Sequence, residues 1–454
     1  MKSSCLFDER EQTRSELRSL GRSLRERASR QSHALWVPGP KRPDPVDILR
    51  SQEGDRVGEL VPIRYGRMAA SPFAFFRGAA AVMAWDLAHT PASGIHVQTC
   101  GDAHVDNFGA YASPERRLVF DINDFDETLP APWEYDVKRM AVSVMLAARN
   151  QGWGDEVGLD SVRLAIQRYS TTLYLLSQMT TLEIHYAHTE SSHLIEETED
   201  PRFADALRRI AEKARKRTHL HIFQKEVITQ DGKQRFVENP PLVARLPDEE
   251  LERMNSLFES YRATLQDNRR HVLQKYRFQD AALRVVGVGS VGLRAYMILL
   301  QGRGEPDPLL IQIKQAVSSV LTPYVGRSGH QWHGQRVVVG QRLMQAISDP
   351  FLGWAPFAQG DFYVRQLRDM KGQTLPADTA YIFEASMSLC GETLARAHAR
   401  SVDPGLLSGY LGREGGPFVE AVVAFARAYA DQSERDYDRL LGAIKQGDVP
   451  AVSL

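Results

Sequence analysis

The stretch from Cys100 to Glu127 (CGDAHVDNFGAYASPERRLVFDINDFDE) gathers seven carboxylates, two asparagines and one histidine around short apolar runs. Asp102 and Asn107 stand there in the pattern D-x-x-x-x-N. An acidic cluster follows the second apolar run and consists of Asp121, Asp124 and Asp126. In phosphoryl transfer, a first Asp accepts the proton of the attacking hydroxyl, while an Asn and a later Asp hold magnesium ions. Any single one of these carboxylates is more often a turn residue in a solvated hairpin, but the ordered set predicts a metal and phosphate site.

The apolar runs around these carboxylates must position them. Strands are predicted from Ile95 to Thr99 and from Leu118 to Ile122, and an alternating segment after Asn107 reaches the latter through a turn at Ala112 to Arg117. Two strands paired through such a turn would bring the polar groups together. A buried helix is predicted next, over WEYDVKRMAVSVMLAARNQG, with Asp136 near its start, where a carboxylate can cap free backbone amides.

A second stretch with the residue types of a phosphate site is RVVGVGSVGLRAYMILLQGRGEPDPLLIQIKQA. Its glycine pattern G-x-G-x-x-G consists of Gly287, Gly289 and Gly292, with Ser290 inside it. In a dinucleotide-binding unit the third Gly opens a helix, whereas here a strand-like run follows, then a turn, then a second strand, LLIQIK. Three strands with glycines in the first bend is the arrangement that covers nucleotide phosphates in kinases, with a Lys on the third strand. Lys314 is the predicted phosphate-binding Lys.

Lys314 lies on an apolar strand and therefore needs an acidic partner, even if its role is only a buried salt bridge. No Asp or Glu occurs between Lys314 and Asp349. The Lys–Glu ion pair expected in a kinase is therefore absent or comes from another part of the chain, and Gln341 is a possible substitute.

Three arginines, Arg64, Arg67 and Arg77, interrupt the apolar and aromatic segment VPIRYGRMAASPFAFFRGAAAVMAWDLA, which is predicted to become helical after Pro72. Guanidinium groups in such surroundings usually have an anionic partner, because an unpaired buried charge is costly. They form either structural salt bridges or contacts with a phosphate or an acidic substrate.

The bulk composition limits the possible partners. The chain has 454 residues, 56 Lys and Arg against 57 Asp and Glu, and three widely spaced cysteines. This balance suggests neither a nucleic-acid surface nor a polyanionic tail, and so few cysteines indicate neither a disulfide framework nor a Cys-rich zinc site. The charged N-terminus lacks the apolar core of a signal peptide, and no apolar run is long enough for a membrane helix. We expect a cytoplasmic protein with no nucleic-acid or membrane partner.

Most of the remaining chain is predicted to be helical. A short hairpin is expected around Asp231 and Gly232, GQRVVVGQRLMQAISD is expected to be a helix, and FYVRQLRDMKG an edge strand that leads to a hinge. The other helical patterns cover Ser161–His188, Pro201–Arg217, Asp248–Lys275, IFEASMSLCGETLARAHARS and Pro417–Ala443.

Together these segments resemble a protein kinase-like fold of the small-molecule phosphotransferase type, as in aminoglycoside and choline kinases, in circularly permuted order. LARAHARS resembles the helix that precedes the catalytic loop in those enzymes, CGDAHVDN resembles that loop, and NDFD resembles its metal-binding motif. The resemblance implies that Asp102 is the catalytic base, that Asn107 and Asp124 are magnesium ligands, and that Asp136 is structural. Cys100 replaces the usual His of the loop, which is expected to alter loop support rather than chemistry. Permutation is tolerable if the new ends lie at the surface and the old ones can be joined.

The chain also resembles the uncharacterised bacterial family DUF2252, from RYGRMAASPFAFFRG through NDFDE to QRLMQAISDPFLGW. That resemblance brings no established substrate.

We therefore expect an α+β, two-lobed protein kinase-like fold in circularly permuted order, with a small antiparallel β-sheet lobe and a larger, mostly helical lobe. The predicted parts are an N-terminal helical arm and linker (1–50), a helical lobe with the catalytic and metal-binding loops (51–280), a β-rich nucleotide-binding lobe (281–372) and C-terminal helices that complete the helical lobe (373–454).

The expected function is an ATP- and Mg²⁺-dependent phosphotransferase that acts on a hydroxyl of an unknown small molecule or protein. The glycine loop with Ser290, together with Lys314, would hold the nucleotide, and the acceptor is expected to meet Arg64, Arg67, Arg77 or the region 213–236. Further possible site residues are Asp121, Asp126, His104 and Gln341.

Three alternatives remain open from the sequence. A catalytically weak nucleotide-binding module (a pseudokinase) is suggested by the missing acidic partner of Lys314, and transfer of AMP requires only a flipped nucleotide. A metallophosphoesterase would use Asp102 and His104 as its first metal ligands, but its companion His motifs are not evident in the sequence.

Overall fold

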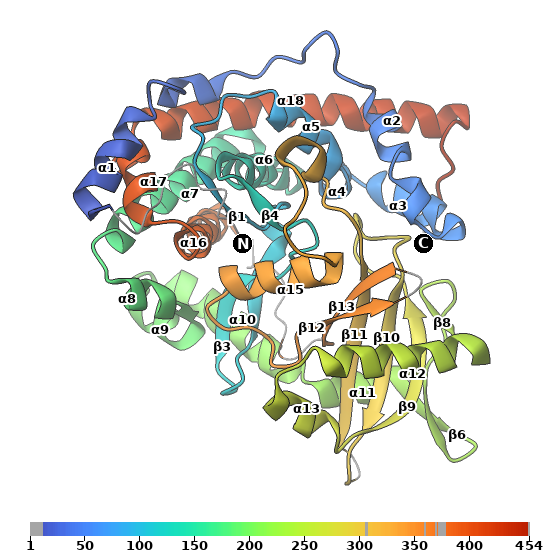
Figure 1. Ribbon diagram of the computed structural model, residues 1–454. Coiled ribbons are helices and arrows are strands. Elements are labelled where there is room, and N and C mark those ends of the chain that lie inside the picture. The colour runs from blue at the N-terminus through green and yellow to red at the C-terminus, as the bar shows by residue number, and fades with distance from the viewer. Residues whose placement is uncertain (1–11, 305–306, 358–359, 368–369, 371–377, 453–454) are drawn as a thin grey trace.

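The protein is described by a computed structural model that covers residues 12–304, 307–357, 360–367, 370 and 378–452 (Figure 1). It is a mixed α+β structure with 53% helix, 16% strand and small antiparallel sheets, which confirms the predicted class. Within the described part of the chain, no helix is both long and apolar enough to cross a membrane.

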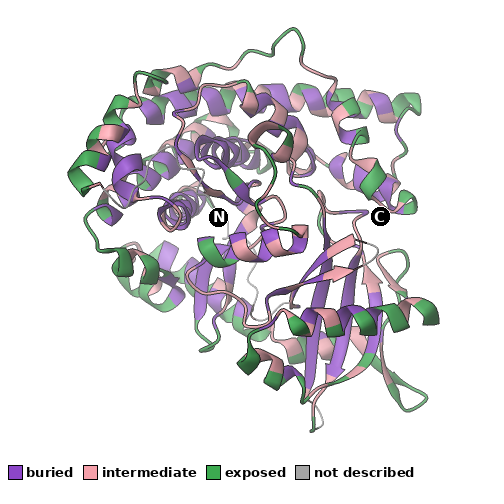
Figure 2. Ribbon diagram, viewed as in Figure 1, coloured by how far each residue is buried: buried purple, intermediate pink, exposed green. Residues whose placement is uncertain are grey.

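The larger part is a helical assembly in which α6 lies at the centre. Its positions from Glu134 to Ala148 are buried, charged ones included, so α6 is purple along most of its length in Figure 2. The outer helix α18 shows alternating buried and exposed bands there, as an amphipathic surface helix should. The main helices of this part are α1 (Arg14–Ser23), α6 (Glu134–Asn150), α7 (Gly154–Leu176), α10 (Pro201–Lys216), α16 (Ala380–Ala399), α17 (Pro404–Leu411) and α18 (Pro417–Gln446).

The N-terminal arm is attached to this assembly through His33. The His33 side chain is buried, its Nε2 lies 2.7 Å from the Tyr410 hydroxyl, and its ring meets Phe418 edge-on. Burial, followed by the charge of Lys138, lowers the pKa of His33 to about 3. The arm is therefore held by a neutral imidazole.

This environment predicts a pH-dependent stability. The pKa of His33 is lower in the folded chain than in the unfolded chain, so below about pH 6.5 only the unfolded chain takes up a proton at this residue. The contribution of the neutral His33 to the free energy of unfolding is therefore complete above about pH 6.5 and is lost as the pH falls toward 3. We expect His33→Gln to reduce the loss of unfolding free energy between pH 6.5 and 4.5 by about 2 kcal/mol. Urea unfolding at both pH values measures this, and an unchanged pH dependence in the variant would contradict it.

The smaller part is built on a six-stranded antiparallel sheet with the order β12-β13-β11-β10-β9-β8. The three strands predicted around the glycine pattern are present as β9, β10 and β11, which pair as consecutive neighbours. The strands are β8 (Val243–Arg245), β9 (Arg277–Arg284), β10 (Ala295–Gln301), β11 (Pro308–Ala316), β12 (Gly353–Phe357) and β13 (Gly360–Gln366).

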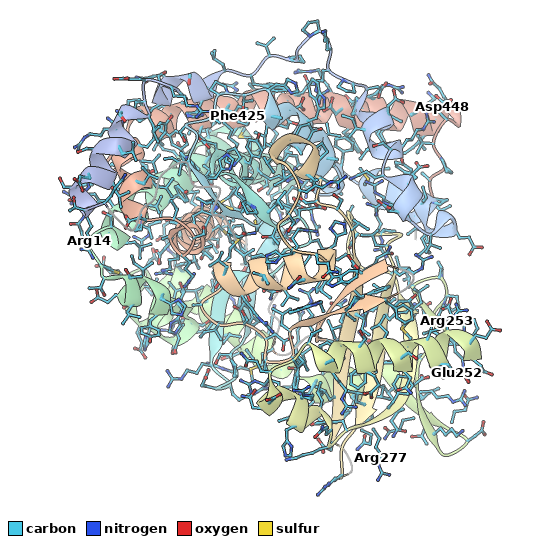
Figure 3. The ribbon with its side chains drawn as sticks, in the orientation of Figure 1. Arg14, Glu252, Arg253, Arg277, Phe425 and Asp448 are labelled. Atoms are coloured by element: carbon cyan, nitrogen blue, oxygen red, sulfur yellow. The ribbon has the colours of Figure 1, made fainter. Side chains whose placement is uncertain are left out.

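Helices cover both faces of this sheet. On one face, α12 (Asp248–Ala263) and α13 (Asp267–Leu273) share a core with the sheet, where Leu257 and Tyr261 meet Ile298 and Ile311. Figure 3 shows Glu252 and Arg253 of α12 on the outer side of the molecule. On the other face, Ile222 of α11 (His219–Glu226) packs with Met297, Leu299 and Leu310. The segment from α11 to α13 therefore belongs with the sheet and not with the helical lobe, where the sequence analysis places it.

Two details of the sheet differ from the sequence prediction. FYVRQ forms β13, which lies between β12 and β11, so it is an interior strand rather than the predicted edge strand. The edge strand next to β13 is β12, which was not predicted from the sequence. The helix predicted after the Lys strand is present as α15 (His333–Met344), and it contacts β12 and β13 as well as β1 (His96–Thr99) of the helical part. Figure 1 shows α15 between the two parts.

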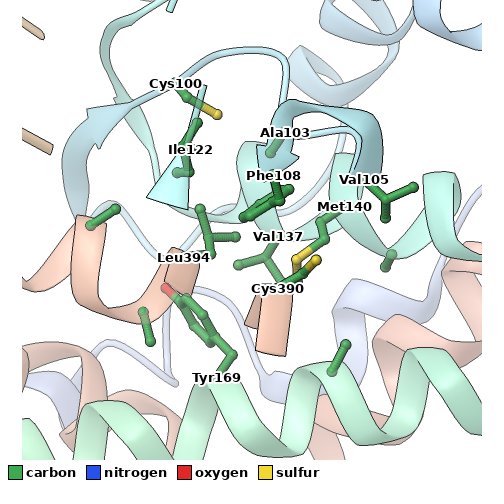
Figure 4. Close-up of a cluster of buried hydrophobic side chains, with 14 of the residues drawn as sticks. Cys100, Ala103, Val105, Phe108, Ile122, Val137, Met140, Tyr169, Cys390 and Leu394 are labelled. Atoms are coloured by element: carbon green, nitrogen blue, oxygen red, sulfur yellow. The ribbon is translucent and has the colours of Figure 1, made fainter. Parts of the chain in front are cut away.

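The predicted acidic hairpin is present. β2 (Phe108–Ala112) pairs antiparallel with β3 (Leu118–Ile122), and β3 also pairs with β5 (Thr189–Glu190). β1 comes directly before the acidic segment and pairs with β4 (Leu129–Pro132), which follows it. The two ends of the segment are therefore held together in one short sheet. The hairpin lies on a buried apolar cluster in which Ile122 and Phe108 lie near Leu394 and Val137 (Figure 4).

Candidate functional site

The loop that carries Asp102 is anchored by Asp136. The Asp136 carboxylate is buried and accepts hydrogen bonds from the backbone N–H of Cys100 at 2.8 Å and of Gly101 at 3.0 Å. His398 Nε2 of α16 lies 3.2 Å from the same carboxylate, and His398 Nδ1 lies 2.9 Å from the Tyr169 hydroxyl. Asp136 thus ties three segments together. From the sequence it was expected to cap the start of its own helix, but its carboxylate accepts from backbone N–H groups of the loop.

We expect Asp136→Ala to lower the free energy of unfolding by about 3 kcal/mol, because two buried backbone N–H groups and His398 would lose their acceptor. Asp160→Ala on the surface of α7 is the matched control and should change it by less than about 0.5 kcal/mol. Denaturant unfolding measures both, and equal effects would show that the Asp136 hydrogen bonds contribute little.

Asp102 is oriented by a buried arginine. Arg139 of α6 donates through Nε to Asp102 Oδ1 at 2.6 Å, and through Nη2 to the Phe76 carbonyl at 2.9 Å. His104 Nε2 lies 3.8 Å from the other carboxylate oxygen, and burial lowers the pKa of His104, which favours the neutral imidazole. The Asn107 amide donates to the Asp102 carbonyl at 2.8 Å, so the predicted base and the predicted metal ligand are held in one turn.

Lys314 on β11 meets the acidic segment. Its Nζ lies 2.6 Å from Asp126 Oδ2 and 3.8 Å from Asp124 Oδ2. The Tyr363 hydroxyl on β13 donates to Asp126 Oδ1 at 2.6 Å, and Tyr363 pairs directly with Lys314 in the sheet. The two carboxylates raise the pKa of Lys314 above its ordinary value despite full burial. The missing acidic partner of Lys314 is therefore Asp126, with Asp124 close by.

The helix α15, which follows the Lys314 strand in the chain, carries a buried arginine. Arg336 of α15 donates through Nη1 to the Thr128 carbonyl at 2.7 Å, and through Nη2 to the carbonyls of Asp126 at 2.9 Å and Val317 at 2.8 Å. Arg336 thereby holds the chain on both sides of the Lys314–Asp126 pair.

The glycine loop between β9 and β10 is held against the helical part. Arg67 donates to the Gly287 carbonyl at 2.6 Å, and the Val57 N–H donates to the Gly292 carbonyl at 2.8 Å. Gly287 and Gly292 have φ angles of 70° and 93°, a region that L side chains rarely adopt. At Gly289 an added Cβ would come within 3.2 Å of the Arg77 carbonyl, so the tip of the loop also fits closely against α4 (Pro72–Gly78).

Two cavities meet between the acidic segment and the glycine loop. The larger cavity, of about 860 Å³, lies under the sheet and is lined by Lys314, Gln312 and Arg365 as well as by α11. The smaller cavity, of about 300 Å³, is lined by Asp102, Asn107 and Asp126. Four residues line both cavities: Arg77, Asp124, Gly287 and Ser290. The two cavities therefore meet beside Asp124 and the glycine loop.

The residues around Asp124 fit a magnesium ion. Asn107 and Asp124 line one cavity and offer amide and carboxylate oxygens, which are hard ligands. Mg²⁺ commonly takes one or two carboxylates plus substrate phosphates and water. In the described ranges, no group of three or more His, Cys, Asp or Glu residues is arranged to hold a metal.

Three of the predicted residues are engaged by other protein groups, and one of them, Asp121, lies away from both cavities. Asp121 is buried on β3, where its carboxylate accepts from the Ile122 N–H, and it lines neither cavity. Gln341 lines the larger cavity but donates to Gln345 at 3.0 Å, so it does not take the place of the acidic partner. Arg77 forms an ion pair with Asp106 at 2.9 Å.

Four residues of the site were not predicted from the sequence: Arg139, Arg336, Tyr363 and Arg365. Tyr363 and Arg365 lie two positions apart on β13, and Arg365 donates to the Asn123 carbonyl at 3.0 Å. The available signal was the position of Arg139 and Arg336 among apolar neighbours in predicted helices, since a buried guanidinium needs acceptors.

The comparisons with known proteins identify a family but no function. No curated protein and no solved structure was found to match the chain. A family model described as an uncharacterised protein conserved in bacteria, DUF2252, matches residues 56–443, so it includes residues of both parts of the structure and the whole lining of the larger cavity. The chain therefore belongs to the bacterial family DUF2252.

Proposed function

We propose that this protein is an ATP- and Mg²⁺-dependent phosphotransferase that acts on a hydroxyl of a small molecule or a protein. The observation that carries the proposal is the contact of Lys314 with Asp126 and Asp124. It joins two phosphate-type motifs that lie 188 residues apart in the chain. A Lys on the third strand that meets the metal-binding carboxylates is the arrangement that kinases use to hold nucleotide phosphates.

The order of the elements supports a kinase-like fold in permuted form. A glycine hairpin, a Lys strand, a helix and two further strands follow one another as β9, β10, β11, α15, β12 and β13. The helix α16 then ends beside the acidic segment, because the Gln98 N–H donates to Ser401 Oγ at 2.9 Å. The end of α16 would thus lie beside the start of the proposed catalytic loop, although that loop comes much earlier in the chain.

In the proposed reaction, Asp102 accepts the proton of the acceptor hydroxyl. The hydroxyl oxygen bonds to the γ-phosphorus of ATP, the bond from that phosphorus to the bridging oxygen breaks, and ADP leaves. Lys314 and the glycine loop hold the triphosphate in the larger cavity, whose volume suits a nucleotide. Mg²⁺, held by Asn107 and Asp124, would neutralise the phosphate charge.

A nucleotide-binding module with little turnover is the second candidate. It is favoured by one observation, the ion pair between Asp102 and the buried Arg139, because this contact already occupies one carboxylate oxygen of the proposed base. AMP transfer remains a variant of the enzyme, since a flipped nucleotide would present its α-phosphorus to the same carboxylates.

Product analysis separates these functions. The purified chain is incubated with ATP and Mg²⁺ and a pool of small metabolites and proteins, and phosphate-bearing and AMP-bearing products are sought by mass spectrometry. ADP together with a phosphorylated product is expected. Pyrophosphate with an AMP adduct would assign the variant, and bound nucleotide with no released product under any condition would assign the binding module.

A further inference from the structure

The segment from Lys213 to Lys225 (KARKRTHLHIFQK) carries charge that the proposed reaction does not use. It contains five Lys and Arg residues, two His and no carboxylate. It forms the end of α10 and most of α11, and its lysines and arginines are exposed or half-buried. Within the described ranges, these five cations form no ion pair and no side-chain hydrogen bond: Lys213, Arg215, Lys216, Arg217 and Lys225.

This basic segment lines one end of the larger cavity. Arg217 follows α10 directly and lines the cavity, as does Arg116 at the tip of the β2–β3 hairpin. The end of α10 lies against the hairpin, because Ala214 packs with Ala110 of β2, and Figure 1 shows α10 beside β3. The hairpin tip is the end of the hairpin farthest from Asp124, which follows β3. Several cations therefore gather at the end of the cavity opposite the proposed metal site.

The positive charge continues past the hairpin tip. A separate hollow of about 380 Å³ is lined by Arg116, Arg117 and Arg215. Glu190 also lines it, but its carboxylate already accepts from Arg117 at 2.8 Å. Because Arg116 lines both spaces, the cations form one continuous basic surface that crosses the hairpin tip.

The larger cavity has an excess of positive charge as well. Its described lining contains seven Lys and Arg residues and four carboxylates. Each of these carboxylates already has a partner in the protein: Asp106 pairs with Arg77, Asp124 lies 3.8 Å from Lys314, Glu226 pairs with Arg284, and Asp349 accepts from two backbone N–H groups. An anionic ligand at the hairpin tip therefore meets unmatched positive charge.

Strand β2 connects this surface with the proposed catalytic loop. β2 begins at Phe108, directly after Asn107, and ends at Ala112 beside the hairpin tip. Phe108, Tyr111 and Ala112 line the larger cavity, so β2 forms one of its walls. Four residue steps along a strand span about 14 Å. An extended segment bound at the tip would therefore place a residue about four to six positions away near Asn107 and the proposed base, Asp102.

We propose that this basic surface docks an acidic, extended segment of a protein, and that this protein is the acceptor. The surface consists of Arg116, Arg117, Lys213, Arg215, Lys216 and Arg217. The role of the bound protein as acceptor rests on the proposed function, whereas the docking surface does not. Arginine clusters recognise carboxylates through charge-assisted hydrogen bonds, and complementary charge speeds the encounter of two proteins.

Two observations favour an acidic protein segment over other anions. A small anion would fill only one of the two spaces that the cations line. Single-stranded nucleic acids are held by stacking on aromatic side chains. No Phe, Tyr or Trp is among the described residues that line the hollow, and Phe223 of the basic segment packs toward the sheet.

The test measures binding of a labelled synthetic peptide to the full chain by fluorescence anisotropy. The peptide contains one serine, a spacer of about four residues and a run of glutamates, and its control has glutamine at every glutamate position. We expect the acidic peptide to bind at least about tenfold more tightly than its control at low salt, and to lose most of this difference at high salt.

Variants of the basic surface assign this binding to its arginines. The combined variant with Arg116→Gln, Arg215→Gln and Arg217→Gln should weaken binding of the acidic peptide about tenfold. Lys445→Gln, which removes an exposed cation of α18, is the control and should leave binding unchanged. Equal binding of the two peptides, or unchanged binding by the combined variant, would overturn the inference.

A single-stranded oligonucleotide with the same number of charges is measured in parallel. If it binds more tightly than the acidic peptide through the same arginines, the surface belongs to a nucleic acid, and the inference is overturned as well. Phosphate transferred from ATP to the peptide serine would support both the docking surface and the proposed function. Arginine-dependent peptide binding by a chain that binds no ATP analogue would support the docking surface and count against the phosphotransferase.

Discussion

Asp102→Asn is expected to lower the rate of phosphoryl transfer by about 10²- to 10⁴-fold, the usual contribution of a general base. The amide oxygen of Asn can still accept from Arg139 Nε, so the loop should keep its conformation. Asn cannot accept the proton of the acceptor hydroxyl. Nucleotide affinity should be nearly unchanged, because Lys314 lines the larger cavity and Asp102 does not.

Transfer rate and nucleotide affinity are measured separately, by product formation at saturating ATP and by titration with a non-hydrolysable analogue. Asp160→Asn on the exposed surface of α7 is the control and should match the wild type in both. An Asp102 variant with an unchanged rate would remove this residue from the mechanism. A variant that loses affinity and rate together would show that Asp102 acts on nucleotide binding.

The second large effect is expected at the Lys314–Asp126 pair. Lys314→Met leaves two carboxylates without their buried cation, so the free energy of unfolding should fall by about 3–5 kcal/mol, and nucleotide binding should be lost with it. Asp126→Asn should restore part of that stability in the Lys314→Met background, because it removes one of the unpaired charges.

The double-mutant cycle measures this coupling. We expect a coupling free energy of about 1–3 kcal/mol between Lys314 and Asp126, since the two groups are in direct contact. Asp205 lies on the exposed surface of α10 and pairs with Arg208, so Asp205→Asn serves as the uncoupled control. Additive effects of Lys314→Met and Asp126→Asn would show that the two side chains do not interact in solution.

Local patterns were enough to predict most elements around the site. The apolar run LVFDI, the turn before it and the strand pattern of LLIQIK predicted β3 and β11 with nearly their observed bounds. β12 was missed because Gly353 and Pro356 are poor strand formers, and its place at the edge, where a Pro is tolerated, depends on tertiary pairing. The same pairing makes β13 an interior strand.

The partner of Lys314 could not be predicted from the residues that follow it in the chain. The next helix, α15, carries Arg336 and no acidic residue. Asp126 comes from a segment far earlier in the chain, and only the packing of the sheet against the acidic hairpin brings it to Lys314. The position of α12 and α13 on the sheet was missed for a related reason, since an amphipathic helix does not indicate which core it covers.

The central claim is that the acidic segment and the sheet form one site for magnesium and nucleotide, and the thermal stability of the full chain tests it most directly. Ligand at 100 times its Kd stabilises by about 2.7 kcal/mol, so ATP with Mg²⁺ should raise the melting temperature of the wild type by about 3–5 °C. Neither ATP nor Mg²⁺ alone should give this shift, and Asp124→Ala should abolish it. An absence of any shift with nucleotide and Mg²⁺, or an equal shift in the Asp124→Ala variant, would contradict the account.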